Sequence, residues 1–353
     1  MPSIRPLRIV VVGAGAFGRN HLRVWRQLGA SGASVQLVAV VEPDAARAAS
    51  VAAEYQVPVY PSVQQLLLAQ SPPDAASVAV PTAHHAAVAT TLLSAGVDVL
   101  VEKPFTSSLE EADALIHLAR HQGRVLQVGH LERFNPAVRA VLPLLNGPLF
   151  FEAHRLSIFS PRSLDVDVVL DLMVHDLDVV LAMVASPVRE VRAVGLPVLS
   201  SKVDIANARV EFASGCIANF TASRVSTERV RKLRFFQPHQ YISIDYARQD
   251  VLAIEVSARP GPGMDPSALD PSVRLQPVTA QHPTPELGLH RLVVPSGEPL
   301  QLELGSFADC VRTRKQPIVT AENGRAALSL ALDILAAVHA HQERTHLQRL
   351  MER

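Results

Sequence analysis

Two side chains with complementary acid–base chemistry stand four positions apart, at Asp171 and His175. On a helix this spacing puts both on one face. Such a pair can be metal ligands, a general base with its neighbour, or an ordinary surface pair. A metal site needs a third and usually a fourth ligand, and the sequence shows no matching His/Cys cluster, so we expect no metal. His175, a residue type with an unperturbed pKa of about 6.5, is suited to take a proton from a hydroxyl group.

A glycine-rich turn, GAGAFG at 13–18, follows an apolar run and opens a helical pattern. Gly13 permits a tight turn, Gly15 lets a pyrophosphate approach the backbone, and Gly18 lets the helix pack on the strand. The start of the helix adds free N–H groups for phosphates. Glycines also serve ordinary turns, but this context favours a dinucleotide site. Its predicted contacts in the turn are Gly13, Gly15, Ala16, Phe17 and Gly18.

An acidic residue, Glu42, follows the second apolar run at 35–41. Its carboxylate can accept hydrogen bonds from the adenosine ribose and would repel a 2′-phosphate, which favours NAD over NADP. Taken alone, Glu42 can equally be a solvated glutamate at a strand end.

Polar residues also end two later strands, at the sheet edge where open α/β proteins hold ligands. Lys103 would place an ammonium where cofactor and substrate meet; the alternative is a charged strand end before a proline turn. His85 can equally be a polar residue at a helix N-terminus. The cofactor contacts predicted at this edge are Pro81, Thr82, His85, Glu102 and Lys103.

The order of apolar patterns predicts two domains in the 353 residues. Strand and helix patterns alternate over residues 1–128, which is typical of the α/β class and predicts a Rossmann domain with a doubly wound parallel sheet. Residues 129–353 predict an α+β substrate-binding and oligomerisation domain on a large, open, mostly antiparallel sheet, with helices over 171–183 and 321–342. The Pro- and Gly-rich stretch 259–299 predicts a long surface excursion that can contain one hairpin.

The composition excludes several classes of protein. The formal net charge is zero, so no global field favours nucleic acid or an anionic membrane. The N-terminus lacks the pattern of a signal peptide, and the uncharged stretch 75–97 is interrupted by Pro81, His84, His85 and Gly96. Two widely spaced cysteines fit a reducing compartment. We therefore expect a cytoplasmic protein.

The chain resembles the Gfo/Idh/MocA (glucose-fructose oxidoreductase/inositol dehydrogenase) family over essentially its whole length. The resemblance rests on GAGAFG, VPTAHH at 80–85, VEKPF at 101–105, VGHLERFNPA at 128–137, DLMVHDLD at 171–178 and the segment from Glu303 to Leu328. It implies that Lys103, Asp171 and His175 form the catalytic group, with His175 as acid/base and Lys103 holding cofactor and substrate. Many members have glycine where this chain has Met173.

Three longer segments, around GHLERFNPA, SPRSLDVDVVLDLMVHDLD and TASRVSTERVRKLRFF, resemble the branch that oxidises UDP-N-acetylglucosamine at C3. The resemblance implies a 3-keto product that is then aminated for lipid A, with a PLP-dependent aminotransferase as functional partner. A diphosphate needs cations, and guanidinium groups can bind it bidentately. We expect two or three of five arginines to contact the ligand, and Asn135 to hold sugar hydroxyls or the acetamido group. The arginines are Arg133, Arg155, Arg162, Arg224 and Arg234.

Two alternatives stay open. Another sugar, inositol or pyrrole-pigment oxidoreductase of the same family would need no cluster of arginines at the pocket. A non-catalytic dinucleotide-binding sensor would need no base beside the nicotinamide. In every case an open sheet needs a partner over its exposed face, so we expect a homodimer or homotetramer.

Overall fold

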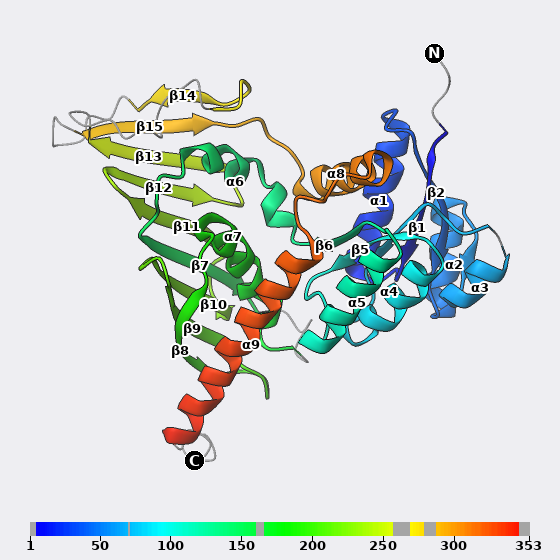
Figure 1. The fold of residues 1–353 in the computed structure, drawn as a ribbon, viewed down its shortest axis with the longest axis horizontal. Coiled ribbons are helices and arrows are strands. Elements are labelled where there is room, and N and C mark those ends of the chain that lie inside the picture. Colours follow the sequence, from blue (N-terminus) through cyan, green and yellow to red (C-terminus); the bar gives the residue numbers. More distant parts are fainter. Residues whose placement is uncertain (1–4, 70, 160–165, 257–268, 279–286, 346–353) are drawn as a thin grey trace. The chain divides into compact units, whose positions relative to one another are not determined.

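The computed structural model describes residues 5–69, 71–159, 166–256, 269–278 and 287–345. Its internal contacts form two compact units, residues 1–131 with 298–328, and residues 132–297 with 329–353 (Figure 1). The sequence prediction placed all of 298–328 in the second domain. The structure instead packs this segment in the first unit, because its apolar side chains complete the core on one face of the Rossmann sheet.

The first unit contains six parallel strands in the order β3-β2-β1-β4-β5-β6. This order confirms the predicted doubly wound sheet. The central strands are buried on both faces, which explains why they read as continuous apolar runs. The strands are β1 (Leu7–Val12), β2 (Val35–Val41), β3 (Val59–Tyr60), β4 (Ala75–Val78), β5 (Asp98–Glu102) and β6 (Leu126–Gly129).

Helices cover both faces of this sheet. Two begin at side-chain caps, because Asp44 accepts a hydrogen bond from the Arg47 N–H and Ser108 accepts one from the Glu111 N–H. The helices are α1 (Ala16–Ala30), α2 (Ala45–Tyr55), α3 (Val63–Ala69), the 3-10 turn η1 (Thr82–His84), α4 (His85–Ser94), α5 (Leu109–His121) and α8 (Pro299–Thr313). Helices α1 and α8 lie side by side and share one apolar core (Figure 1).

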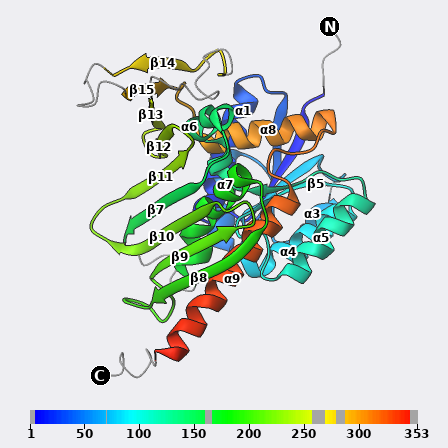
Figure 2. The same ribbon diagram turned by 60° about the vertical axis from the view of Figure 1, so that its left-hand side comes forward.

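The second unit contains a nine-stranded sheet in the order β14-β15-β13-β12-β11-β7-β10-β9-β8 (Figure 2). Every neighbouring pair is antiparallel except β7 and β10, which run parallel, so the prediction of a mostly antiparallel sheet is confirmed. The strands are β7 (Phe150–Ile158), β8 (Val188–Leu196), β9 (Ile205–Phe212), β10 (Ile217–Ser226), β11 (Val230–Gln237), β12 (Gln240–Asp245), β13 (Asp250–Val256), β14 (Arg274–Pro277) and β15 (Leu287–Val293).

One face of the large sheet is covered by helices, and the other is open. The covered face packs buried aromatic side chains such as Phe151, Phe220 and Phe235 against Val169 and Leu177. The helical elements are η2 (Leu131–Phe134), α6 (Pro136–Val141), η3 (Leu142–Leu144), the π-helix η4 (Val169–Met173), α7 (Val174–Val184) and α9 (Ala321–Arg344). The last helix contributes its first residues to the first unit and the rest to the second.

The stretch 259–299 is only partly described. Strands β14 and β15 pair with each other in antiparallel fashion, as the one hairpin that the prediction allowed in this stretch, and β15 also pairs with β13, so this part extends the sheet. The rest, at 257–268 and 279–286, lies outside the described residues. No described helix has the length and apolar character that a bilayer crossing requires.

Candidate cofactor and catalytic site

The glycine turn between β1 and α1 has the geometry of a pyrophosphate cradle. Gly13 has φ of +92°, and a Cβ there would lie 2.6 Å from the Ala79 carbonyl oxygen. A Cβ on Gly18 would lie 2.0 Å from the Gly13 carbonyl oxygen. A Cβ on Gly15 would meet nothing within 4 Å. The first and third glycines therefore let the chain close on itself, while the second faces open space where a diphosphate can approach.

This contrast predicts opposite outcomes for two alanine substitutions. Gly15→Ala should keep the melting temperature but weaken NAD binding by about tenfold or more, because the methyl group enters the space for the diphosphate. Gly18→Ala should lower the free energy of unfolding by about 1–3 kcal/mol or more, because helix and turn must separate. Thermal unfolding and NADH fluorescence titration measure both quantities. Equal effects of the two substitutions on stability would contradict this reading of the turn.

A cavity of about 620 Å³ lies at the carboxyl ends of β1, β2 and β4. It is lined by the glycine turn, Glu42, Arg47, Pro81 and His84, among others. Its volume lies in the range of small-molecule sites, and its place at the point where the strand order reverses is where this fold binds dinucleotides. These residues fit the adenosine half of NAD.

Glu42 is buried in this cavity wall rather than solvated at a strand end. Its carboxylate accepts hydrogen bonds from the Ala14 N–H at 2.9 Å, the Asp44 N–H at 2.9 Å and the Arg47 guanidinium at 3.0 Å. Burial opposes ionisation, but these donors outweigh it and lower the pKa of Glu42. A carboxylate accepts about four hydrogen bonds, so about one remains for a ribose hydroxyl.

Glu42→Ala should shift cofactor preference toward NADP. The substitution removes the charge that repels a 2′-phosphate and releases the Arg47 guanidinium to bind it, so we expect the NAD/NADP ratio of kcat/KM to fall by about tenfold or more. The matched control is Glu54→Ala, which removes an exposed ion pair with Arg19 from the end of α2. An unchanged preference in Glu42→Ala would mean that Glu42 does not read the ribose.

The ends of β4 and β5 are joined by a buried histidine. His85 Nε2 lies 2.9 Å from the Val80 carbonyl oxygen, and Nδ1 lies 3.0 Å from that of Pro104. Burial disfavours the cation and lowers the pKa of His85 against the opposing effect of these carbonyl groups. The ring therefore connects the segments that follow β4 and β5. The sequence predicted a cofactor contact for His85 instead. Thr82 begins η1, and the half-buried Lys103 follows β5 with a cis peptide bond to Pro104.

In the second unit, Asp171 and His175 lie where a π-helix changes into an α-helix. The sequence predicted one helix from 171 to 183, but the structure has a π-helix over Val169–Met173 before α7. Such π-turns occur often at functional sites. Asp171 and His175 are half-buried, whereas Met173 between them is in the core. Among the described residues, no group of three or more His, Cys, Asp or Glu side chains is arranged to hold a metal.

A buried ionic network fixes the helix that carries His175. Arg155 donates to both carboxylate oxygens of Asp176, at 2.7 and 3.0 Å, and to Glu132 at 3.0 Å. Its side chain is 4% exposed, and its guanidinium lies 5.1 Å from the centre of the Tyr246 ring. Burial opposes the charge, but the two carboxylates outweigh it and raise the pKa of Arg155. This geometry makes Arg155 a structural residue instead of the predicted diphosphate contact.

Asn135 is also committed to the protein itself. Its amide nitrogen donates to Glu132 at 3.1 Å and to the Tyr246 carbonyl oxygen at 3.0 Å, while its oxygen caps α6 by accepting from the Ala137 N–H. The residue is 1% exposed. With both amide N–H groups used and the residue buried, Asn135 is held by the protein and is not placed for the predicted contact with sugar hydroxyls or an acetamido group.

The other arginines of the predicted cluster are spread over different places. Arg224 is buried, donates to Asp204 at 2.8 Å and to the Val166 carbonyl oxygen at 2.7 Å, and so holds the chain just before the π-helix. Arg234 alternates with the buried Leu233 and Phe235, which puts it on the open face of the sheet, away from α7. Arg162 lies outside the described residues. Arg133 is 3.5 Å from Asp178 and keeps a partly exposed side chain.

The basic residues Arg229, Arg231 and Lys232 predict a solvated turn, but the structure places Arg231 in β11, as a cation on the covered face of the sheet. It pairs across strands with Arg155, and it shares the alternation of Leu233 and Phe235 toward that face. Although the residue as a whole is exposed, desolvation by the groups around its guanidinium and the Arg155 charge lower the pKa of Arg231. The period of two from Phe235 back to Arg231 was the signal that could have found it.

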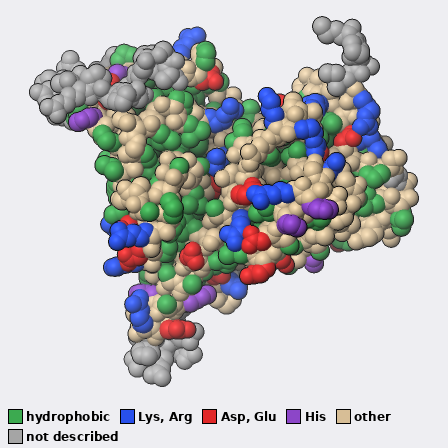
Figure 3. All heavy atoms as spheres, viewed as in Figure 1, with side chains coloured by type: hydrophobic (Ala, Val, Ile, Leu, Met, Phe, Trp, Pro, Cys, Tyr) green, Lys and Arg blue, Asp and Glu red, His purple; other side chains and the backbone are tan. Residues whose placement is uncertain are grey.

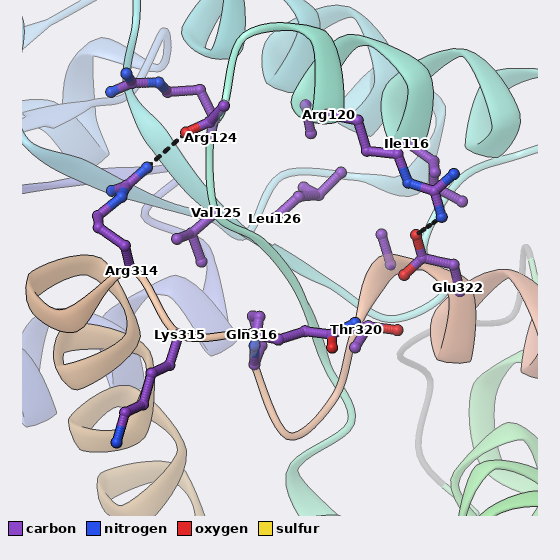
Figure 4. A pocket seen from close by; sticks show the side chains of 14 residues that line it. Ile116, Arg120, Arg124, Val125, Leu126, Arg314, Lys315, Gln316, Thr320 and Glu322 are labelled. Atoms are coloured by element: carbon purple, nitrogen blue, oxygen red, sulfur yellow. Dashed lines mark hydrogen bonds and ion pairs between the residues drawn. The ribbon is translucent and has the colours of Figure 1, made fainter.

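A second cavity, of about 370 Å³, lies at the amino end of β6, on the sheet edge opposite the glycine turn (Figure 4). Three of its cations already have acceptors: Arg120 pairs with Glu322 at 2.6 Å, Arg124 donates to the Gly96 carbonyl oxygen at 2.9 Å, and Arg314 binds Asp98 and the Gly123 carbonyl oxygen. Figure 4 shows Lys315 pointing away from Thr320 and Glu322. On the face shown in Figure 3, charges of both signs are interspersed. Neither this cavity nor the charged surface in Figure 3 offers a better ligand site than the glycine turn.

Comparison with known proteins agrees with this geometry. The family model of the Gfo/Idh/MocA oxidoreductases, which describes an NAD-binding Rossmann fold, matches residues 7–130. The family model of the GFO/IDH/MocA C-terminal domain matches residues 151–238. A UDP-N-acetylglucosamine 3-dehydrogenase of Acidithiobacillus ferrooxidans is 35% identical over 96% of this chain and 99% of its own. A solved structure of that organism's enzyme, GnnA, matches with a TM-score of 0.83 and 34% identity, covering 96% of this chain and 99% of the other.

A more distant relative, the scyllo-inositol 2-dehydrogenase (NAD(+)) of Bacillus subtilis, is 27% identical over 89% of each chain. The matched models cover both domains, and the 35% identity extends over nearly the whole chain. The chain therefore belongs to the Gfo/Idh/MocA family of NAD-dependent oxidoreductases.

Proposed function

We propose that this enzyme oxidises the C3 hydroxyl of UDP-N-acetylglucosamine to a 3-keto sugar. The observation that carries the proposal is the 35% identity with a UDP-N-acetylglucosamine 3-dehydrogenase over 96% of this chain and 99% of that protein. The match to the inositol enzyme of Bacillus subtilis is weaker in both identity and coverage. The likeness therefore favours a nucleotide sugar over a free polyol.

The proposed catalytic group is Lys103, Asp171 and His175. When bound, NAD supplies the acceptor for the hydride that leaves the sugar carbon. His175 takes the proton of the reacting hydroxyl, and Asp171, nearly one helical turn away, orients its imidazole. Lys103 holds the hydroxyl oxygen by a charge-assisted hydrogen bond.

The diphosphate of the substrate needs a cation that the protein has not already neutralised. Arg155 and Arg224 are buried against carboxylates, so Arg231 takes this role in the proposal. Arg133 assists it, since its ion pair with Asp178 is 3.5 Å long and its side chain stays partly exposed. Arg231 has an exposed guanidinium on the same sheet face as α7, and among the described residues it forms no ion pair within 4.0 Å. Its lowered pKa reflects a site where an added anion would be stabilised.

Arg231→Met should weaken binding of the nucleotide sugar without affecting NAD. Losing a charge-assisted hydrogen bond costs about 1.5–3 kcal/mol, so KM for UDP-N-acetylglucosamine should rise by about tenfold or more while KM for NAD is kept. The matched control is Arg229→Met, an exposed arginine two positions away in the turn before β11. Equal KM values for both variants would remove Arg231 from the proposed site.

The substrate itself is tested by the absorbance of NADH. Purified protein receives NAD with UDP-N-acetylglucosamine, UDP-glucose, free N-acetylglucosamine or myo-inositol, in the presence of an aminotransferase and an amino donor that remove the ketone. We expect NADH with UDP-N-acetylglucosamine alone. NADH with a free polyol would keep the catalytic group but overturn the nucleotide-sugar substrate, and silence with all four would favour a dinucleotide-binding sensor.

The proposal includes a cellular context. A 3-keto sugar is a substrate for amination, so a PLP-dependent aminotransferase is the proposed functional partner, with lipid A as the destination of the amino sugar. Both cysteines are free thiols buried in the structure, and burial raises the pKa of Cys216 to about 11. Unpaired thiols fit the cytoplasm, where the nucleotide sugar and NAD are found.

We also propose that the open face of the large sheet joins copies of this chain. Cross-strand neighbours Phe150, Phe236 and Tyr241 form an aromatic row on this face, with ring centres 5.7 and 5.0 Å apart. Phe236 is 39% exposed. Exposed apolar rows of this kind mark protein contacts. Sedimentation equilibrium should give the mass of a dimer or tetramer of the 38.1 kDa chain, and a stable monomer would contradict the proposal.

A further inference from the structure

A buried histidine connects three of the sequence motifs that surround the cofactor site. His21, on α1, is 0% exposed, and its Nε2 lies 2.9 Å from the Oε1 of Glu102. Glu102 is the last residue of β5, directly before Lys103. Among the described residues, His21 Nδ1 has no hydrogen-bond partner, so the polar contact of this ring is its contact with Glu102.

The Glu102 carboxylate is held on a second side by the backbone of β6. A Cβ on Gly129 would lie 2.6 Å from Glu102 Oε1 and 2.9 Å from Oε2. Glu102 and Gly129 are also paired in the sheet register. The carboxylate therefore fills the space that the missing Gly129 side chain leaves, and it has little freedom to rotate. The Glu102 carboxylate is therefore held by His21 and by the backbone at Gly129, whereas the sequence predicted a cofactor contact for Glu102.

The same histidine touches the glycine turn. The Phe17 ring packs edge-on against the His21 ring, with centres 5.3 Å apart and planes at 67°. Phe17 is 37% exposed and lies in the first turn of α1, beside the open space at Gly15. One side chain thus contacts both the turn that would hold the diphosphate and the strand end that carries Lys103.

We propose that His21 is a positioning residue for Lys103. Its hydrogen bond fixes Glu102, and the fixed Glu102 sets the backbone at the end of β5 from which the Lys103 ammonium extends. Through Phe17, the same ring makes the position of Lys103 sensitive to how the glycine turn is held. The role given to Lys103 rests on the proposed function, whereas its position can be measured without turnover.

Three substitutions separate positioning from ordinary packing. His21→Gln places an amide nitrogen near the position of Nε2 and keeps a donor for Glu102. His21→Asn is shorter, places its amide near Nδ1, and cannot reach Glu102. The matched control is Trp25→Phe, one turn further along α1, which removes the buried hydrogen bond from Trp25 Nε1 to Ser77 Oγ, in β4, at 2.9 Å.

The test is amine labelling of the NADH-bound protein with acetic anhydride, read by peptide mass spectrometry. The chain has four lysines, Lys103, Lys202, Lys232 and Lys315, and the exposed Lys202 and Lys315 serve as internal references. In His21→Asn, the labelling of Lys103 relative to Lys315 should change by about threefold or more, because lysine reactivity follows its surroundings. In His21→Gln and Trp25→Phe the ratio should stay within about twofold of the unmodified protein.

Turnover should follow the same order. His21→Asn should lower kcat by about tenfold or more with little change in KM for NAD, and His21→Gln should recover most of it, because small misplacement of a catalytic group is costly. Wild-type labelling ratios in a folded His21→Asn variant would overturn the proposal. If the unmodified protein turns over no sugar nucleotide, the proposed function fails, but the labelling ratios still decide the role of His21.

Discussion

His175→Ala should lower turnover by about 10²–10⁴-fold while NADH still binds with its original affinity. In the proposed mechanism the imidazole takes the hydroxyl proton. His175 lies in the second unit, whereas the glycine turn, Glu42 and Lys103 belong to the first. Removing it takes away the base without altering the cofactor cradle. Steady-state kinetics and a fluorescence titration measure the two effects separately.

A distant histidine provides the control for this experiment. His121→Ala, at the exposed end of α5, should keep both turnover and NADH affinity. Turnover by His175→Ala close to that of the unmodified protein would remove His175 from its role as base. Loss of NADH binding in the same variant would mean that the substitution also damages the cofactor site, which contradicts the separation of base and cofactor cradle.

Arg155→Ala should lower the free energy of unfolding by about 3–5 kcal/mol. The substitution leaves two buried carboxylates, Glu132 and Asp176, without their cation. A buried unpaired charge costs much more than the ion pair itself contributes, so the loss should be visible as a lower urea midpoint. Turnover should fall as well, since Asp176 follows His175 on α7.

An exposed ion pair of similar length is the matched control. Arg189 pairs with Glu211 at 3.1 Å, and the Arg189 side chain is 71% exposed. Because exposed pairs contribute little, Arg189→Ala should cost at most about 1 kcal/mol. If Arg155→Ala costs no more than Arg189→Ala, the network is not what holds α7 to the sheet.

Local patterns were enough to predict much of the fold. The alternation of apolar runs and helical patterns predicts strands over 7–12, 35–41 and 98–102 and a helix over 109–121, and these are the bounds of β1, β2, β5 and α5 in the structure. Strand β3 has only two residues, Val59–Tyr60, and so has no period to detect. Helix α8 was not predicted, because it directly follows a Pro- and Gly-rich stretch. Its place beside α1 depends on contacts between segments far apart in the chain.

In the candidate site as well, features formed by sequence neighbours could be predicted, whereas those that depend on distant partners could not. The glycine turn could be predicted because the turn, strand and helix are neighbours in sequence. The burial of Arg155 and Arg224 could not, because their carboxylate partners lie 20 or more positions away. An arginine on a strand can face a ligand or a buried acid, and only tertiary contacts decide between the two. The same contacts bring Arg231 beside Arg155.

The most direct test of the proposed reaction uses UDP-N-acetylglucosamine carrying deuterium at C3, with NAD and a trap for the ketone. Mass spectrometry then follows the label. Oxidation at C3 predicts that the NADH formed carries deuterium and that the sugar product has lost it. NADH without deuterium would mean that another hydroxyl reacts, and no NADH at all would mean that this nucleotide sugar is not the substrate.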